Sequence, residues 1–137
     1  MQNHLRLSLR FLSLTALGTA LGCSSSAWKP ADGPHPDVVV TMHFHSFEPN
    51  TVTINAGETV RWENKTLIDH TVTADPALAK KPEDVALPSG ATPFDLGEVG
   101  GGGAVQHTFT VPGTYRYFCK PHELKGMVGE VVVNAAK

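Results

Sequence analysis

Short stretches in which apolar and polar residues alternate recur along the chain from residue 38 onward. Over residues 38–45, the apolar side chains of Val38, Val40, Met42 and Phe44 occupy every second position, a period of two that predicts a half-buried strand. Seven to eight short strands separated by turns predict an all-β fold, a Greek-key sandwich or barrel. The other expected strands, rich in β-branched and aromatic residues, are 51–54, 59–63, 70–74, 106–111, 114–119 and 129–134.

Turn signals separate these strands, and one long segment has no regular period. Asn55-Ala56-Gly57-Glu58 and Pro112-Gly113 each predict a tight turn. Residues 75–104 contain four prolines and a run of glycines, so we expect an irregular connection there, with no more than a broken helical turn over 77–86. Phe47 and Trp62 are the large residues expected in the core.

The composition fits one small domain. The chain has 137 residues, of which 41% are hydrophobic and 18% charged, with a formal net charge of −2, and this length leaves room for a single domain. The first 22 residues hold two arginines and no acidic residue, so the remainder has 9 basic and 13 acidic residues and a formal charge of −4. No basic run remains, which argues against binding of nucleic acid or of anionic lipid by charge.

Residues 1–22 have the pattern of an export signal. Arg6 and Arg10 precede an uncharged stretch of twelve residues, which is too short for a membrane-spanning helix of roughly 20 residues. Ala20-Leu21-Gly22-Cys23 resembles a bacterial lipoprotein box in which Cys23 is lipidated, whereas the small triplet Ser25-Ser26-Ala27 suits ordinary cleavage. The serines after Cys23 favour lipidation over a chance cysteine.

These observations divide the chain into three parts. We expect an export signal at 1–22, a flexible tether rich in Ser, Pro and Gly at 23–36, and the folded domain at 37–137. The domain is expected in the periplasm, or facing the periplasm or exterior from a membrane. A lipid anchor at Cys23 would be its sole membrane attachment.

The cysteines and histidines predict a metal site. If Cys23 is lipidated or removed, Cys119 has no partner, and a lone cysteine in an oxidising compartment indicates metal binding, catalysis or an intermolecular bridge. Cys119, His122 and Met127 lie within nine residues, and His70 adds a second imidazole. Two histidines, one cysteine and a weak axial methionine form the donor set of electron-transfer copper sites. The residues therefore predict one copper ion that cycles between Cu(I) and Cu(II).

Five motifs occur in order along residues 38–133, and the ligand loop has the spacing Cys-x2-His-x4-Met. This order resembles the cupredoxin family, and within it the plastocyanin and pseudoazurin branch. The resemblance implies a blue-copper site with His70, Cys119, His122 and Met127 as ligands, and transient electron exchange with redox protein partners. The motifs are Phe47-Glu48-Pro49, AGETVRWEN at 56–64, His70-Thr71-Val72, PGTYRYFCKPH at 112–122, and Met127-Val128-Gly129.

Two departures from the family pattern bear on function. Glu123 and Lys125 lie in the ligand loop where plastocyanins have mostly small or apolar residues, so we expect the partner-docking face to differ. Thr71 follows His70 where many relatives have Asn. This substitution leaves open which side chain connects the two ligand loops.

Other interpretations of the same residues remain at this point. Zinc also accepts Cys and His ligands, although a thioether is a rare ligand in structural zinc sites, and Cys119 could simply be a buried small hydrophobe. His43 and His45 are two apart on the first expected strand and could bind a second metal, but two solvated histidines explain them more simply.

The sequence as a whole predicts an electron carrier rather than an enzyme. A closed set of four ligands suits one-electron transfer between redox partners outside the cytoplasm, and we expect a monomer. The alternative is a periplasmic copper-binding or delivery protein, which needs a site that exchanges its metal readily. A copper enzyme would need further ligands, and the remaining histidines are too few and too scattered to supply them.

Overall fold

The structure is a computed structural model, which describes residues 36–136. The predicted export signal, and the predicted tether except for Pro36, lie outside the described residues. Among the described residues, no helix is long and apolar enough to span a membrane.

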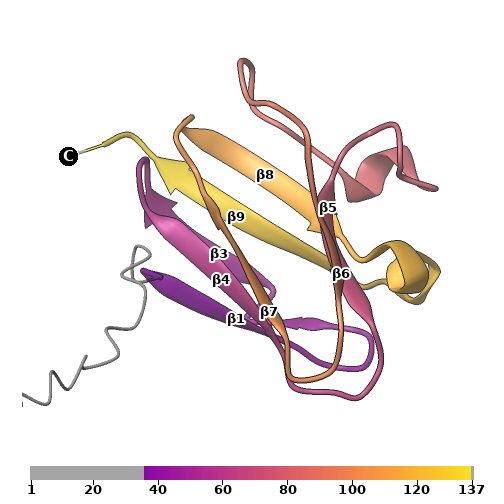
Figure 1. Ribbon diagram of the computed structural model, residues 1–137. Helices are drawn as coiled ribbons and strands as arrows, with labels where there is room; N and C mark the ends of the chain where they lie inside the picture. The colour runs from indigo at the N-terminus through magenta and orange to yellow at the C-terminus, as the bar shows by residue number, and fades with distance from the viewer. Residues whose placement is uncertain (1–35, 137) are drawn as a thin grey trace, which may run out of the picture. The chain divides into compact units, whose positions relative to one another are not determined.

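The described residues form nine strands in two sheets, and Figure 1 shows the sheets packed face to face. One sheet has the order β2-β1-β4-β7 and the other the order β3-β9-β8-β5-β6. The predicted all-β sandwich is therefore confirmed. The strands are β1 (Val38–Met42), β2 (Phe47–Glu48), β3 (Thr51–Asn55), β4 (Thr59–Asn64), β5 (His70–Ala74), β6 (Phe94–Val99), β7 (Ala104–Thr108), β8 (Gly113–Phe118) and β9 (Val128–Asn134), and two 3-10 helices are η1 (Pro82–Asp84) and η2 (Lys120–Lys125).

Neighbouring strands are often distant in sequence, as a Greek-key arrangement requires. β1 pairs in parallel with β4, with Val40 opposite Trp62, and β3 pairs in parallel with β9, with Val52 opposite Val131. The strand with the most aromatic residues, β8, lies between β9 and β5 and pairs antiparallel with both. These pairings join the beginning and the end of the domain in one sheet.

The core lies between the two sheets. It consists of the side chains that the alternation of apolar and polar residues predicts to point inward. Along β3 and β9 every second side chain is buried, which matches the period of a strand with one face on the core. Trp62 and Phe47 are buried, as predicted, and both pack edge-on against Tyr117, with ring centroids 5.3 and 4.8 Å away. This packing gives the site a rigid support.

The structure differs from the sequence prediction in the segment 75–104. It contains η1 and a strand, β6, which pairs with β5 at the edge of its sheet. The strand was missed because its apolar alternation is limited to Phe94 and Leu96 and is interrupted by Gly97, which has a φ of 79°. The expected helical turn over 77–86 is reduced to the three residues of η1.

The first strand also ends earlier than predicted. β1 stops at Met42, and the chain turns back there because the His43 N–H donates to the Ser46 carbonyl at 2.9 Å. His43 and His45 therefore lie in a turn rather than on one strand face, which corrects the geometry expected for a second metal site.

Candidate metal centre

The four predicted ligands come from four places in the chain that meet at one end of the sheets. His70 is the first residue of β5 and Cys119 directly follows β8. His122 lies within η2, and Met127 directly precedes β9. Strand ends are fixed by their sheet, so this placement holds the side chains on rigid supports (Figure 1).

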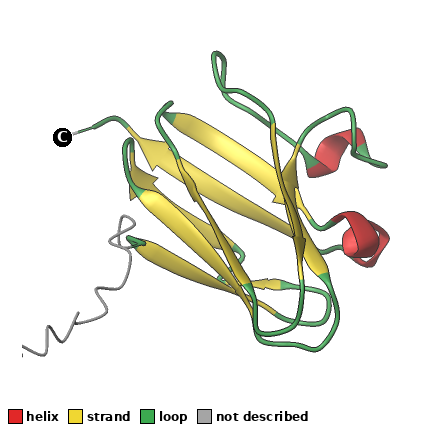
Figure 2. Ribbon diagram, viewed as in Figure 1, coloured by secondary structure: helices red, strands yellow, loops and turns green. Residues whose placement is uncertain are grey.

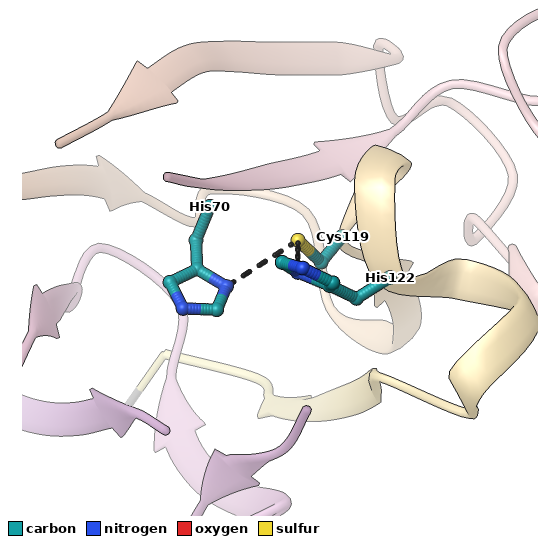
Figure 3. Close-up of side chains that lie close together, drawn as sticks. All are labelled: His70, Cys119 and His122. Carbon is teal, nitrogen blue, oxygen red and sulfur yellow. Dashed lines mark hydrogen bonds between the residues drawn. The ribbon is translucent and has the colours of Figure 1, made fainter. Parts of the chain in front are cut away.

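Three of the four donor groups converge on one point. The Cys119 Sγ lies 3.6 Å from the Nδ1 of His70 and 3.4 Å from the Nδ1 of His122, and Figure 3 shows the two rings directed at the sulfur. The donor atoms of the three residues all lie within 4.8 Å of one another. This spacing allows one ion to contact all three.

Met127 lies beside this cluster and is fully buried. Its carbonyl accepts the N–H of Cys119 at 3.1 Å, and its N–H donates to the carbonyl of His122 at 3.3 Å. The backbone of Met127 is thus bonded to two of the converging residues. Gly126, which has a φ of 81°, makes the turn that brings Met127 back to them, a conformation that glycine adopts at low cost.

The environment of Cys119 fits a bound cation. The side chain is completely buried, and burial raises the pKa of the thiol, although hydrogen bonding from the Thr71 N–H to Sγ at 3.4 Å opposes this rise. A metal ligand must be a thiolate. A buried thiolate needs a positive charge close by, and a metal ion between the sulfur and the two imidazoles supplies it.

The histidines are already in the state that binds metal. Burial lowers the pKa of His70, and the charge of His122 lowers it further. Burial also lowers the pKa of His122, with a smaller contribution from His45. Both imidazoles are therefore neutral at pH 7, and a neutral imidazole has the free lone pair that a metal requires.

A hydrogen-bond chain fixes which nitrogen of His70 faces the sulfur. The Thr66 hydroxyl donates to Asn64 Oδ1 at 2.8 Å, so its oxygen can accept the Nε2–H of His70 at 3.2 Å. The proton on Nε2 leaves Nδ1 free on the side of Cys119. Asn64 belongs to a motif recognised in the sequence, but its buried position and the role of Thr66 carry no sequence signal of their own.

Thr71 connects the two ligand loops. Its backbone N–H donates to the Cys119 sulfur, and its Oγ1 accepts the N–H of Lys120 at 2.8 Å. The connection that the sequence left open is therefore made by the threonine itself, from its main chain and its side chain together.

Glu123 does not reach the surface, so its carboxylate is not itself part of an exposed docking face. The side chain is fully buried beneath η2. Its carboxylate accepts the N–H of Lys80 at 2.8 and 3.0 Å and the N–H of Lys81 at 2.8 Å. Lys125, the other unusual residue of the loop, is exposed.

His43 and His45 do not form a second cluster of ligands. The Nε2 of His43 pairs with the Oε2 of Glu48 at 3.1 Å, while the ring of His45 lies edge-on to His122 with centroids 5.2 Å apart. Within residues 36–136, the one group of three or more His, Cys, Asp and Glu residues with metal-binding spacing is the cluster around Cys119.

The match to known families decides the identity of the metal. Residues 37–134 match the model of the copper binding proteins of the plastocyanin/azurin family. The chain belongs to this family. Copper is therefore the cofactor, in preference to zinc, and the resemblance to cupredoxins is confirmed.

Individual relatives agree with the family match. The chloroplastic plastocyanin of Hordeum vulgare is 35% identical over 127 residues, which cover 90% of this chain and 73% of that protein. The plastocyanin of Scenedesmus fuscus is 40% identical over 91 residues, 64% of this chain and 85% of that protein. Among solved structures, a reduced single-substitution variant of amicyanin has 27% identity and a TM-score of 0.58, covering 76% of this chain and 88% of that one. This family member is thus of the blue-copper electron-carrier class.

Proposed function

We propose that this protein carries single electrons between redox partners outside the cytoplasm, with one copper ion held by His70, Cys119, His122 and Met127. The convergence of two histidine nitrogens and the Cys119 sulfur within 4.8 Å is the observation that carries the proposal. A bound copper ion supplies the one-electron couple between Cu(II) and Cu(I).

The surroundings of the donor atoms support fast electron transfer. Cys119 is held by the Thr71 N–H, and His70 by the Thr66 hydroxyl. Both ligands are completely buried. Donors that are fixed by packing and hydrogen bonds change little when the charge of the site changes, which lowers the reorganisation that accompanies each transfer.

The exposure of His122 supports an electron exit through its ring. His122 is partly exposed, unlike His70 and Cys119. Large apolar side chains are exposed on three segments that border the site, with Phe44 64% exposed, Leu67 96% and Leu124 65%. Exposed apolar side chains of this kind favour short-lived contacts with another protein.

A second route leads through the covalent chain. Cys119 directly follows β8, in which Tyr117 is buried in the core and Phe118 is also buried. An electron that leaves through the Cys119 sulfur enters this strand without crossing a gap between side chains. The protein itself makes and breaks no substrate bond in this scheme, so the proposed activity is not enzymatic.

The location and the assembly state rest on the sequence. The export pattern of residues 1–22 and the lipoprotein-like box at Cys23 support an exported protein, in the periplasm or anchored to a membrane by lipid. We propose that it acts there as a monomer that meets its partners transiently.

Voltammetry of the copper-loaded full chain, together with a competition for its metal, tests the proposal against copper delivery. We expect a reversible one-electron wave and one copper ion that a mild chelator does not remove within minutes. Delivery predicts rapid loss of copper to the same chelator. An irreversible or absent wave would contradict the electron-carrier function.

A further inference from the structure

A basic surface lies beside the ligand loop. We call it the η face and define it by Lys80, Lys81 and Lys125, with the exposed side chains of Leu78 and Leu124 among them. Leu78 is 43% exposed and Leu124 is 65% exposed. Figure 2 shows η1 and η2 next to each other at the end of the sheets. The η face therefore borders the loop that holds His122.

The buried carboxylate of Glu123 fixes this arrangement. Glu123 follows His122 directly, and it accepts the backbone N–H groups of Lys80 and Lys81. In addition, the Nζ of Lys80 donates to the Lys120 carbonyl at 3.4 Å. The two lysines are thus held at the ligand loop although more than 35 residues separate them from it in sequence.

The lysines of the η face form no ion pair with any acidic side chain that the structure describes. Among the ion pairs of residues 36–136, none involves Lys80, Lys81 or Lys125. The one carboxylate inside the loop, that of Glu123, is buried. Asp95 is paired with Lys120. Three lysines that form no ion pair among the described residues therefore lie near one another, on a chain whose net charge is negative.

Glu83 and Asp84, the acidic residues of η1, contact β8 through a backbone carbonyl and a shared cavity. The Glu83 carbonyl accepts Arg116 Nη1 at 3.0 Å, and Asp84 lines a cavity of about 360 Å³ together with Arg116 and Glu130. Arg116 belongs to β8. Asp84 therefore borders β8, and no ion pair among the described residues joins either acidic residue of η1 to the lysines beside η2.

Other charged groups around the site are already paired or lie on different loops. Lys65 pairs with Glu63 at 2.6 Å, and His43 pairs with Glu48 at 3.1 Å. Asp69 lies in the β4–β5 connection, directly before His70. The surroundings of His122 are thus asymmetric, with free positive charge on the η side.

From this asymmetry we propose that the η face docks a redox protein with an acidic surface, which brings the partner's redox group to the exposed edge of His122. The inference rests on the proposed electron-carrier function. Complementary charge speeds the encounter of two proteins, and the apolar side chains among the lysines suit a brief protein contact. A protein partner fits better than an anionic membrane, because the electron needs an acceptor or donor group at the contact.

Electron transfer from reduced cytochrome b5, an acidic protein, provides the test. In this reaction the haem iron(II) gives up one electron and becomes iron(III), and the oxidised copper centre takes it up, with no proton transferred. The copper-loaded full chain is compared with the triple variant Lys80→Gln/Lys81→Gln/Lys125→Gln and with Lys65→Gln, a control at an ion-paired lysine on another loop. Hexaammineruthenium(II), a small cation, serves as the second reductant.

We expect the triple variant to react with cytochrome b5 about tenfold more slowly at low ionic strength, and this difference to vanish at about 0.5 M salt. Lys65→Gln should change the rate by less than about twofold, and each single lysine variant should fall between it and the triple variant. With the ruthenium complex the triple variant should react no more slowly than wild type. Unchanged reduction potentials and visible spectra would show that the metal site itself is intact.

Three results would overturn the inference. The first is a triple variant that reacts with cytochrome b5 at the rate of Lys65→Gln. The second is a rate loss that persists at high salt. The third is lysine-dependent binding to phosphatidylglycerol vesicles with no effect on the cytochrome rate, which would assign the η face to a membrane. Failure to accept an electron from either reductant would instead contradict the proposed function, and the docking with it.

Discussion

Thr71 illustrates how much of the metal site depends on a single uncharged residue. Its main chain contacts the Cys119 sulfur and its hydroxyl accepts the Lys120 N–H, so one residue next to His70 holds both ends of the ligand set. Its presence in the sequence indicated a departure from the family, but the pattern alone did not say whether a threonine could reach the other loop. The answer depends on the distance between loops that are 48 residues apart in sequence.

Thr71→Val removes the hydroxyl with little change of shape. The partly buried Lys120 N–H then loses its acceptor. A fully buried unsatisfied donor costs about 1–3 kcal/mol, so we expect the free energy of unfolding to fall by about 1 kcal/mol. Copper should also dissociate faster. Thr53→Val, at an exposed position of β3, is the control. Equal stabilities of the two variants in denaturant unfolding would contradict the role of Thr71.

Met127 is the proposed ligand whose role can be tested by two opposite substitutions. Met127→Leu removes the sulfur donor at similar volume, so stability should change by less than about 1.5 kcal/mol. Weaker donation disfavours the oxidised ion, and the reduction potential should rise. Met127→Gln provides a harder oxygen donor that favours the oxidised ion, and the potential should fall. If voltammetry finds the same potential in both variants, Met127 has only a packing role.

His107 gives the domain a pH dependence that is independent of the metal. Its ring stacks on Phe94, with centroids 4.3 Å apart, and burial lowers its pKa below the ordinary value of 6.5. The unfolded chain therefore binds a proton more readily than the folded one. The stability that neutral His107 contributes is present above about pH 6.5 and is lost as the pH falls toward the lower pKa of the folded state.

His107→Phe keeps an aromatic ring against Phe94 and removes the titrating group. We expect the free energy of unfolding of the copper-loaded wild type to fall more between pH 7.5 and pH 5.5 than that of the copper-loaded variant. Comparing the two proteins cancels the contributions that they share, including those of the ligand histidines. Parallel pH profiles would show that His107 does not titrate differently in the folded state.

At the level of elements, η2 and the segment before η1 behave as one unit because Glu123 joins them. Sequence patterns predicted the ligand loop but not this connection. A glutamate in a polar loop is exposed in most proteins, and only the fold shows that two N–H groups satisfy its carboxylate. β6 was missed for a related reason, since its apolar alternation covers only Phe94 and Leu96 and its place at the sheet edge depends on pairing with β5.

Glu123→Ala breaks the connection between these elements. Two backbone N–H groups lose a charged acceptor, and hydrogen bonds of this kind contribute about 1.5–3 kcal/mol each. We expect the free energy of unfolding to fall by at least 2 kcal/mol, roughly the value of one such bond. Glu98→Ala, at an edge-strand residue outside the ion pairs of residues 36–136, is the control. If denaturant unfolding shows that Glu123→Ala loses no more stability than Glu98→Ala, the result would contradict this account.

For the whole molecule, the sequence predicted the fold class and the convergence of His70, Cys119 and His122, and it proposes Met127 as the fourth ligand, but it did not predict the surroundings of these residues. Alternation reveals strands such as β3 and β9 because each has one face on a common core. The ligands are recognisable because their chemistry and spacing are local to one loop, with His70 the sole distant member. The other features depend on contacts between segments that are remote in sequence. These features are the strand order, the burial of Glu123 and the distribution of charge around His122. The alternation of apolar and polar residues along the chain does not reveal them.

The visible absorption spectrum of the copper-loaded chain tests the central claim most directly, because the colour depends on a bond between copper and the Cys119 sulfur. We predict an intense charge-transfer band in the oxidised protein, which disappears on one-electron reduction and returns on oxidation. Cys119→Ser should fold, since the strands supply the core, but should lack the band. A colourless wild type with one bound copper ion, or an equally intense band in Cys119→Ser, would contradict the proposed metal centre.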